Sequence, residues 1–120
     1  MNTIIVLVLA LIAAVSCQTA PIWAEQFYIQ FNETMLAGHT NGTFWYDAKN
    51  SKTRMDRVNG KWDRYCGSVY KLVDTPCTHL VVNGLRYLVF PQKQYCCMCC
   101  DASRGCGVTR RGLIDQHGCC

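Results

Sequence analysis

Residues 78–90 read THLVVNGLRYLVF, and this stretch decides the fold class. Two runs rich in branched and aromatic residues flank Asn83-Gly84, a dipeptide that type I′ turns favour because both positions take a positive φ. We therefore predict strands at 78–82 and 85–90, with Pro91 ending the second. A two-residue loop places one apolar set on a single face, the expected core face: Leu80, Val82, Leu85, Tyr87 and Val89. The other face, with His79, Val81, Arg86 and Leu88, is half apolar too.

Similar signals predict more strands upstream. Phe27, Ile29 and Phe31 alternate with Tyr28, Gln30 and Asn32, the period of two that is typical of a strand. Further strands are expected at 43–46, 53–58 and 61–65, with a turn at 38–42. Asn59-Gly60 predicts a second hairpin between the last two, although its register would place Asp56 opposite Asp63. The sequence thus predicts an all-β fold, a curved antiparallel sheet of hairpins.

The composition is that of one small globular domain. The chain has 120 residues, half of them apolar and 17% charged, which excludes a disordered, highly charged chain. The net charge of +4 is only mildly basic. Basic and aromatic residues mix within 46–65, a pattern that would suit nucleic acid or anionic glycans. Acidic residues in the same segment dilute its charge, so we expect a solvated sheet face and no nucleic-acid partner.

An N-terminal apolar run predicts export. Residues 4–15 carry no polar side chain and are long enough for the hydrophobic region of a signal peptide, but too short for a spanning helix. We therefore predict a cleaved signal peptide at 1–17 and a secreted, extracellular protein without a membrane span. An uncleaved anchor and lipidation of Cys17 are the alternatives. Two sequons predict glycosylation at Asn32 and Asn41.

The mature chain is expected to comprise a β-sheet domain at 18–107, cysteine-rich from 96, and a short tail at 108–120. The chain has 10 cysteines, the density of a disulfide scaffold. Disulfides are therefore expected at Cys66, Cys77, Cys96, Cys97, Cys99, Cys100, Cys106, Cys119 and Cys120. The overlapping C-x-x-C spacings at 96–100 leave two alternatives open: a zinc or copper site completed by Cys106 and His117, or a redox-active pair.

Catalytic signatures are absent from the sequence. The three histidines, His39, His79 and His117, lie in no recognisable catalytic motif, and no serine-hydrolase elbow, zinc-protease motif or phosphate loop occurs. We therefore expect a protein that is not an enzyme and that needs no cofactor and no metal.

Several short motifs occur in a characteristic order between Pro21 and Gly107. They are Trp23, Phe27 and Phe31 in the first strand, GTFWYD at 42–47, RMDR at 54–57, DRYC at 63–66, Pro76-Cys77, RYL at 86–88 and the cysteine cluster at 96–106. With them the chain resembles a group of small secreted cysteine-rich protist proteins, themselves distantly similar to ependymin-related proteins. Members of that family continue past Gly105-Cys106-Gly107 with further strands, so this chain is expected to be half-sized or truncated.

The resemblance implies a fold and a function. Ependymin-like proteins resemble bacterial lipoprotein carriers, in which a strongly curved antiparallel sheet surrounds an apolar pocket. For this chain, the resemblance implies an extracellular, non-catalytic protein that binds lipid or another hydrophobic ligand. The expected apolar lining is Phe27, Ile29, Phe31, Leu80, Val82, Tyr87 and Val89. A second copy could cover the open sheet edge. The alternative function is a structural cell-surface or extracellular-matrix component, cross-linked through Cys119 and Cys120.

Overall fold

The computed structural model describes residues 22–35, 38–109 and 111. The predicted signal peptide lies outside the described residues, as does most of the predicted tail.

The chain divides into two compact units. One unit, Ala24–Thr109, holds every strand and helix described below. In the other unit, Arg111 Nε donates a hydrogen bond of 2.7 Å to the backbone carbonyl of Trp23.

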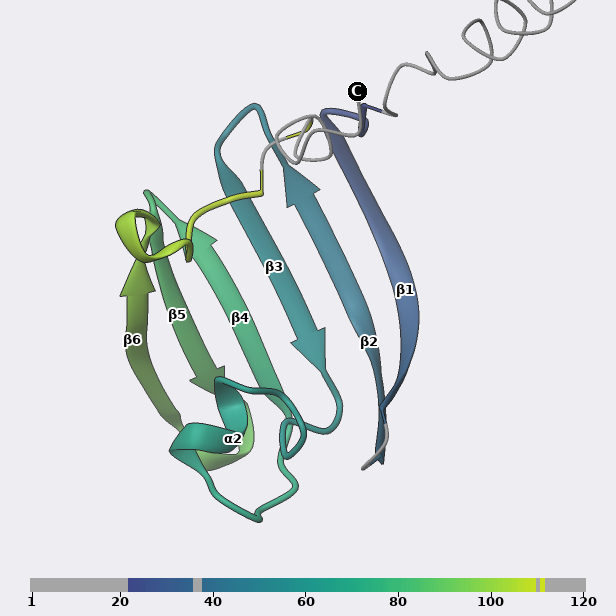
Figure 1. The fold of residues 1–120 in the computed structure, drawn as a ribbon, viewed down its shortest axis with the longest axis vertical. Helices are drawn as coiled ribbons and strands as arrows, with labels where there is room; N and C mark the ends of the chain where they lie inside the picture. The colour runs from purple at the N-terminus through teal and green to yellow at the C-terminus, as the bar shows by residue number, and fades with distance from the viewer. Residues whose placement is uncertain (1–21, 36–37, 110, 112–120) are drawn as a thin grey trace, which may run out of the picture. The chain divides into compact units, whose positions relative to one another are not determined.

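Six antiparallel strands form one open sheet, in the order in which they occur along the chain (Figure 1). The strands are β1 (Gln26–Met35), β2 (Gly38–Asp47), β3 (Lys52–Arg57), β4 (Cys77–Val82), β5 (Leu85–Phe90) and β6 (Tyr95–Asp101). Helical structure in the described residues is limited to one turn of α-helix and two short 3₁₀ turns: α2 (Cys66–Val69), η1 (Pro91–Lys93) and η2 (Ala102–Arg104). The predicted all-β fold with an antiparallel sheet of hairpins is confirmed.

The hairpin predicted around Asn83-Gly84 is confirmed in detail. Asn83 has φ 52° and Gly84 has φ 74°, so both central residues take the left-handed conformation of a type I′ turn. The register places Val82 opposite Leu85 and Leu80 opposite Tyr87, as a two-residue loop requires. The 3₁₀ turn η1 begins at Pro91, directly after β5.

The hairpin predicted around Asn59-Gly60 does not form. Residues 61–65 are turns rather than a strand, and β3 pairs with β4 instead. Gly60 packs closely against β4, because a Cβ at this position would lie 2.8 Å from both the Thr75 carbonyl oxygen and the Cys77 Cβ. The glycine is therefore used for close packing, and the repulsive pairing of Asp56 with Asp63 is avoided.

The turn predicted at 38–42 is also wrong, since these residues begin β2 and pair with β1. A Cβ on Gly42 would collide with the backbone carbonyl of Asp56 on β3. Here glycine permits close approach of two strands rather than a change of chain direction.

One face of the sheet, the covered face, lies under the segment between β3 and β4. Residues opposite each other in antiparallel strands share a face, and every second residue of a strand lies on that face. By this register, the covered face carries Phe27, Tyr46, Val81, Leu88 and Phe90. Helix α2 and its flanking loops lie in front of β4 and β5 in Figure 1. Tyr65, Val69 and Tyr70 from this segment pack against a buried cluster of Cys66, Cys77, Leu88 and Phe90.

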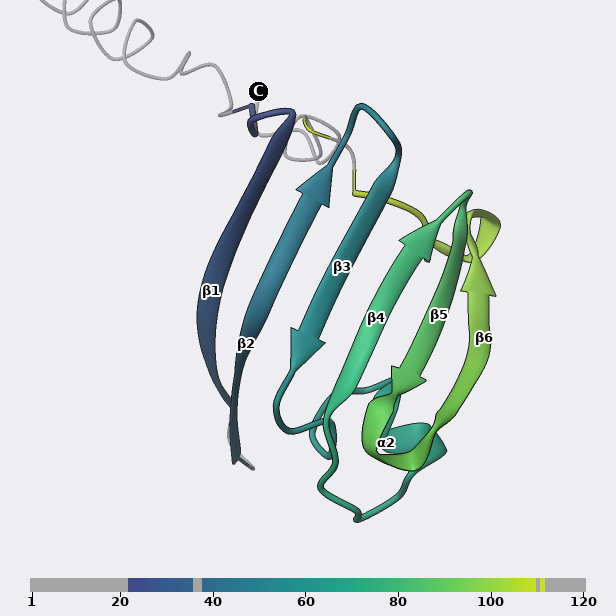
Figure 2. The same ribbon diagram turned by 180° about the vertical axis from the view of Figure 1, so that it is seen from behind.

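The predicted core face was therefore the wrong one. The buried residues of β4 and β5 are Cys77, His79, Val81, Leu88 and Phe90. The expected core set, Leu80, Val82, Leu85, Tyr87 and Val89, is only partly buried and lies on the opposite face, here called the open face. Seen from that side, β4, β5 and β6 lie in front of α2 (Figure 2). Both faces are apolar enough to form a core, and the covering segment determines which one does.

Candidate functional site

A continuous row of side chains crosses the open face of the sheet. The register places each member opposite the next on the neighbouring strand, from β1 to β6. This open-face row consists of Tyr28, Trp45, Arg54, Leu80, Tyr87 and Met98. Tyr28 is 70% exposed. Trp45 and Met98 are exposed as well, whereas Leu80 and Tyr87 are half-buried. Exposed apolar residues that lie together are more typical of an interaction site than single scattered ones.

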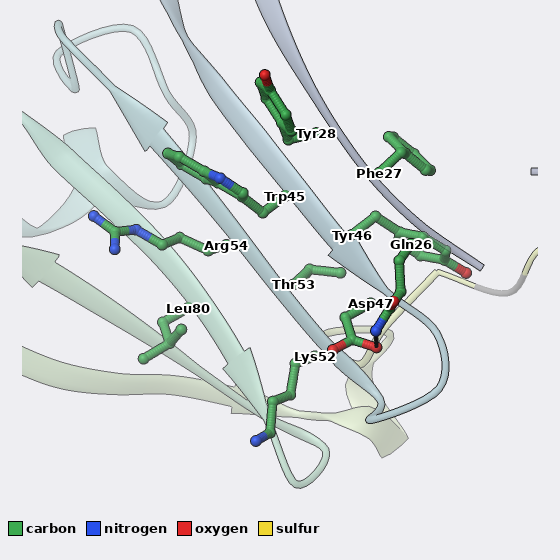
Figure 3. Close-up of a pocket in the computed structure, with 10 residues that line it drawn as sticks. All are labelled: Gln26, Phe27, Tyr28, Trp45, Tyr46, Asp47, Lys52, Thr53, Arg54 and Leu80. Carbon is green, nitrogen blue, oxygen red and sulfur yellow. Dashed lines mark hydrogen bonds between the residues drawn. The ribbon is translucent and has the colours of Figure 1, made fainter. Parts of the chain in front are cut away.

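The β1–β4 end of this row lines a shallow groove of about 450 Å³, here called the open-face groove. Figure 3 shows Tyr28, Trp45, Arg54 and Leu80 projecting from four successive strands along it. The complete lining is Gln26, Phe27, Tyr28, Trp45, Tyr46, Asp47, Lys52, Thr53, Arg54 and Leu80.

Two cations border this apolar surface, and they differ in their partners. The Arg54 guanidinium lies 5.1 Å from the centre of the Trp45 ring. It also donates hydrogen bonds of 2.9 and 2.8 Å to the Asp56 carboxylate, and these bonds raise the pKa of Arg54. Arg54 is thus held over the tryptophan as part of the groove wall. Within the described residues, the Lys52 ammonium forms no ion pair and no hydrogen bond.

Asp47, beside Lys52, is an acceptor that is already engaged. Asn50 Nδ2 donates to Asp47 at 2.7 Å and Gln26 Nε2 donates at 3.0 Å. These hydrogen bonds, the one from Asn50 first, hold the pKa of Asp47 below 3.8. The charge of Lys52 also lowers the pKa of Asp47, so the ammonium faces an ionised carboxylate although it forms no ion pair with it. The groove thus offers an aromatic and aliphatic surface with an ammonium group at one end, a combination suited to binding an amphipathic anion.

The predicted apolar lining does not come together in one place. Phe27, Ile29 and Phe31 lie on the covered face, whereas Leu80, Val82, Tyr87 and Val89 lie on the open face. Two of the seven, Phe27 at its rim and Leu80, line the open-face groove, and the other five do not. The period of two shows which residues of one strand share a face, but not which faces of distant strands coincide. The prediction missed Tyr28, Trp45, Lys52 and Arg54, because only the register across β1–β3 brings these side chains to the groove.

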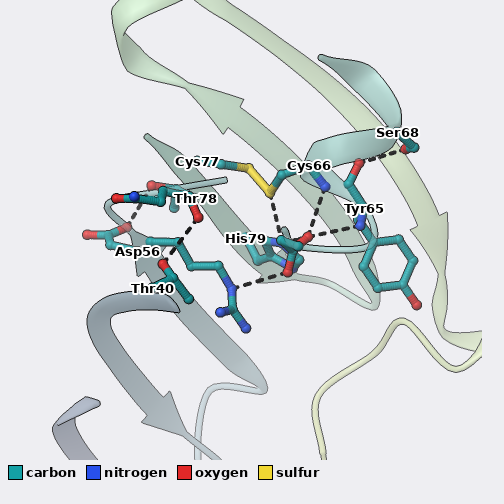
Figure 4. The surroundings of a disulfide bond; sticks show 11 residues. Thr40, Asp56, Tyr65, Cys66, Ser68, Cys77, Thr78 and His79 are labelled. Carbon is teal, nitrogen blue, oxygen red and sulfur yellow. Dashed lines mark hydrogen bonds and ion pairs between the residues drawn. A yellow bond between two sulfur atoms is a disulfide. The ribbon is translucent and has the colours of Figure 1, made fainter. Parts of the chain in front are cut away.

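A buried polar cluster lies under the segment that covers the sheet (Figure 4). The Asp63 carboxylate accepts hydrogen bonds of 2.9 Å from the backbone N–H groups of Tyr65 and Cys66. It also lies 3.0 Å from His79 Nε2 and 3.1 Å from Arg57 Nε. His79 was expected to have no catalytic role, and here its ring is buried against this carboxylate.

The electrostatics of this cluster favour an ionised Asp63. Burial alone would raise the pKa of this carboxyl. The hydrogen bond and charge of His79, the Cys66 N–H and the Arg57 guanidinium together lower the pKa from 3.8 to about 2. A charge at this depth remains favourable only because it is surrounded by donors.

Four of the cysteines expected in disulfides are paired, as Cys66–Cys77 and Cys100–Cys106. The prediction is wrong for Cys96, Cys97 and Cys99, which are free thiols. These cysteines lie in β6, where a register shift against β5 interrupts the alternation of faces. The Cys99 thiol lies 3.5 Å from Cys100 Sγ, but Cys100 is bonded to Cys106. Cys97 and Cys99 pack against the buried cluster, and Cys96 is exposed. Cys17, Cys119, Cys120 and His117 lie outside the described residues.

The two sequons occupy paired positions. Asn32 on β1 lies opposite Asn41 on β2, and both side chains are exposed. Both belong to the open face, because Tyr28 and Asn32 lie an even number of residues apart on β1.

No helix in the described part of the chain is long and apolar enough to span a membrane. Comparisons with protein-family models, curated proteins and solved structures found no match to this chain.

Proposed function

We propose that this protein is a secreted, non-catalytic binding protein that takes an amphipathic anion, such as a fatty acid, in the open-face groove. The apolar part of the ligand lies over Tyr28, Trp45 and Leu80, and its anionic end pairs with Lys52. The observation that carries the proposal is the groove itself, in which the exposed Tyr28 and Trp45 and the half-buried Leu80 lie beside an ammonium group without an ion pair. Support also comes from the resemblance to ependymin-related proteins, which implies a ligand of the same class.

The groove favours binding over catalysis on chemical grounds. Its titratable groups are Tyr28, Tyr46, Asp47, Lys52 and Arg54, and the Asp47 carboxylate already accepts hydrogen bonds from two neighbours. A flat aromatic surface instead stabilises a ligand by burial, at about 25 cal/mol per Å² of apolar area removed from water.

Titration of the secreted protein with a dansyl-labelled fatty acid tests this proposal. Trp45→Ala removes the largest apolar surface of the groove, so we expect the Kd to rise about ten-fold or more. Trp62→Ala is the matched control, because both tryptophans are 38% exposed and Trp62 does not line the groove. Equal effects of the two substitutions, or no saturable binding by the unmodified chain, would overturn the proposal.

The role of Lys52 has its own test. Lys52→Glu should weaken binding of the fatty acid but not of its uncharged methyl ester, since the ester carries no anionic group to pair or repel. Lys93→Glu, on the exposed η1 turn, is the control for a change in net charge. An equal loss for the acid and the ester would show that Lys52 does not bind the head group.

A second candidate function, a cross-linked structural component, is favoured by one observation. Cys96 is an exposed free thiol on β6, which is an edge strand of the sheet. Edge strands readily pair with another chain. Cross-linking through this edge predicts multimers on non-reducing gels that disappear on reduction and in Cys96→Ser. Multimers that persist in Cys96→Ser would assign the cross-link to another cysteine.

A further inference from the structure

Three groups with metal-binding chemistry meet beneath α2 on the covered face, and the Asp63 carboxylate lies next to one of them. Cys66 Sγ, Cys77 Sγ and a ring nitrogen of His79 all lie within 4.8 Å of one another. His79 Nε2 is 3.2 Å from Cys66 Sγ and 3.0 Å from the Asp63 carboxylate (Figure 4). Both cysteines are 1% exposed, and the Asp63 side chain is 8% exposed. A disulfide now joins the two sulfur atoms.

We propose that reduction of the Cys66–Cys77 bond converts this cluster into a zinc site, with Cys66, Cys77, His79 and Asp63 as ligands. Two thiolates, one imidazole and one carboxylate form a four-coordinate set that suits tetrahedral Zn²⁺. This site is distinct from the open-face groove and does not depend on the proposed function.

The chemistry of the conversion balances with a dithiol as reductant. The dithiol supplies two electrons and two protons, the S–S bond breaks, and the reductant becomes a disulfide. Zn²⁺ then displaces the protons of the Cys66 and Cys77 thiols, which pass to solvent. His79 binds through the Nε2 lone pair, so its ring proton lies on Nδ1.

The surroundings of the cluster match the charge of such a site. The charges of the two thiolates and Zn²⁺ cancel. The Arg57 guanidinium, 3.1 Å from Asp63, faces the carboxylate and also pairs with Glu33 on β1. Backbone N–H groups of Tyr65 and Cys66 already hold that carboxylate in place. Such outer contacts orient metal ligands and strengthen binding.

The fold also allows the small movement that the conversion needs. A tetrahedral zinc ion holds two sulfur atoms roughly 3.8 Å apart, farther than in a disulfide. Cys77 is fixed in β4, which pairs with strands on both sides. Cys66 belongs to a single helical turn between loops, so this side can move. The site would be closed, with four protein ligands and an enclosing wall of Tyr65, Val69 and Tyr70.

Cobalt binding to the full chain tests the proposal. The protein is reduced with a phosphine, which does not compete for the metal as thiols do, and is titrated with Co²⁺ without oxygen. We expect one Co²⁺ per chain with the visible bands of tetrahedral thiolate coordination, displaced by Zn²⁺. The oxidised protein should show none of these bands.

Two sets of variants assign the ligands. His79→Gln should weaken Co²⁺ binding about ten-fold or more and shift the bands, whereas His39→Gln, an exposed histidine on β2, should change neither. Replacing Cys96, Cys97 and Cys99 together with serine should leave the bands intact. No binding after reduction, loss of binding in the triple serine variant, or indifference to His79→Gln would overturn the site.

A measurement on the unmodified chain covers the case in which a variant fails to fold. Reduced protein is alkylated with iodoacetamide with and without Zn²⁺, and each cysteine is followed by mass spectrometry. Zinc should slow alkylation of Cys66 and Cys77 by about ten-fold or more and leave Cys96 unaffected. Protection confined to the cysteines at 96–106, or protection of none, would refute the assignment.

Discussion

The covered and open faces of the sheet are built from the same strands, yet only one becomes a core. On the covered face Phe90 is fully buried, whereas on the open face Met98 is 60% exposed. Both faces of the β4–β5 hairpin are apolar enough to form a core. The difference is the 58–76 segment, which packs over one of them. Apolar content alone therefore does not define a core in a small open sheet.

The segment reaches the covered face because several independent contacts hold it there. The Cys66–Cys77 disulfide ties α2 to β4. Asp63 from the same segment pairs with His79 on β4 and Arg57 on β3. The open face has no comparable covalent or ionic tether within the described residues.

The largest expected difference between the faces is in core stability. Phe90→Ala should lower the free energy of unfolding by about 3–5 kcal/mol, because it leaves a cavity in the buried cluster. Tyr87→Ala, on the same strand but on the open face, should cost about 1 kcal/mol or less. Denaturant unfolding of both variants measures the difference, and equal losses would contradict the assignment of the faces.

A smaller effect should appear at acid pH on the covered face. The pKa of Asp63 is about 2 in the folded protein and 3.8 as its ordinary value, so its contribution to stability is fully present above pH 3.8. This contribution falls as pH drops toward the folded value of about 2, with a total of about 2 kcal/mol. Unfolding free energies between pH 5 and 2 should show this decline.

Asp63→Asn is the control for that decline. The amide does not titrate, so the variant should be less stable at neutral pH and should lose stability less steeply as the pH falls. An unchanged slope in the variant would assign the acid sensitivity to other carboxylates.

The smallest expected effect on stability is on the open face. Trp45→Ala should change the free energy of unfolding by less than about 1 kcal/mol while weakening ligand binding. Phe44→Ala, one residue earlier, should cost about 1 kcal/mol more, since its ring contacts Phe27 and Tyr46 on the covered face. If Trp45→Ala proves the more destabilising, the tryptophan belongs to the core rather than to a binding surface.

Two Asn-Gly dipeptides show how far sequence reasoning reaches. Asn83-Gly84 forms the predicted turn because the flanking strands pair with each other and agree with the local preference. Asn59-Gly60 has the same local preference, but β3 pairs with β4, and Gly60 packs beneath Cys77. The local turn preference is outweighed by tertiary contacts, among them the Cys66–Cys77 disulfide, which typically contributes about 2–4 kcal/mol.

The candidate site was predicted only in part. Leu80 was named as a lining residue, and Trp45 was placed in a strand, but neither was linked to Tyr28 or Lys52. The groove exists because Tyr28, Trp45 and Arg54 lie side by side across three strands. That alignment depends on register, which the alternation within a single strand does not reveal.

By itself, the sequence determined the fold class, the β4–β5 hairpin and the presence of disulfide cross-links. These features follow from local alternation, turn chemistry and cysteine content, which neighbouring residues specify. Only the tertiary structure decided which face is buried, which cysteines pair and which side chains form the groove. Those outcomes depend on contacts between residues far apart in the chain, where packing and ion pairing choose among locally acceptable alternatives.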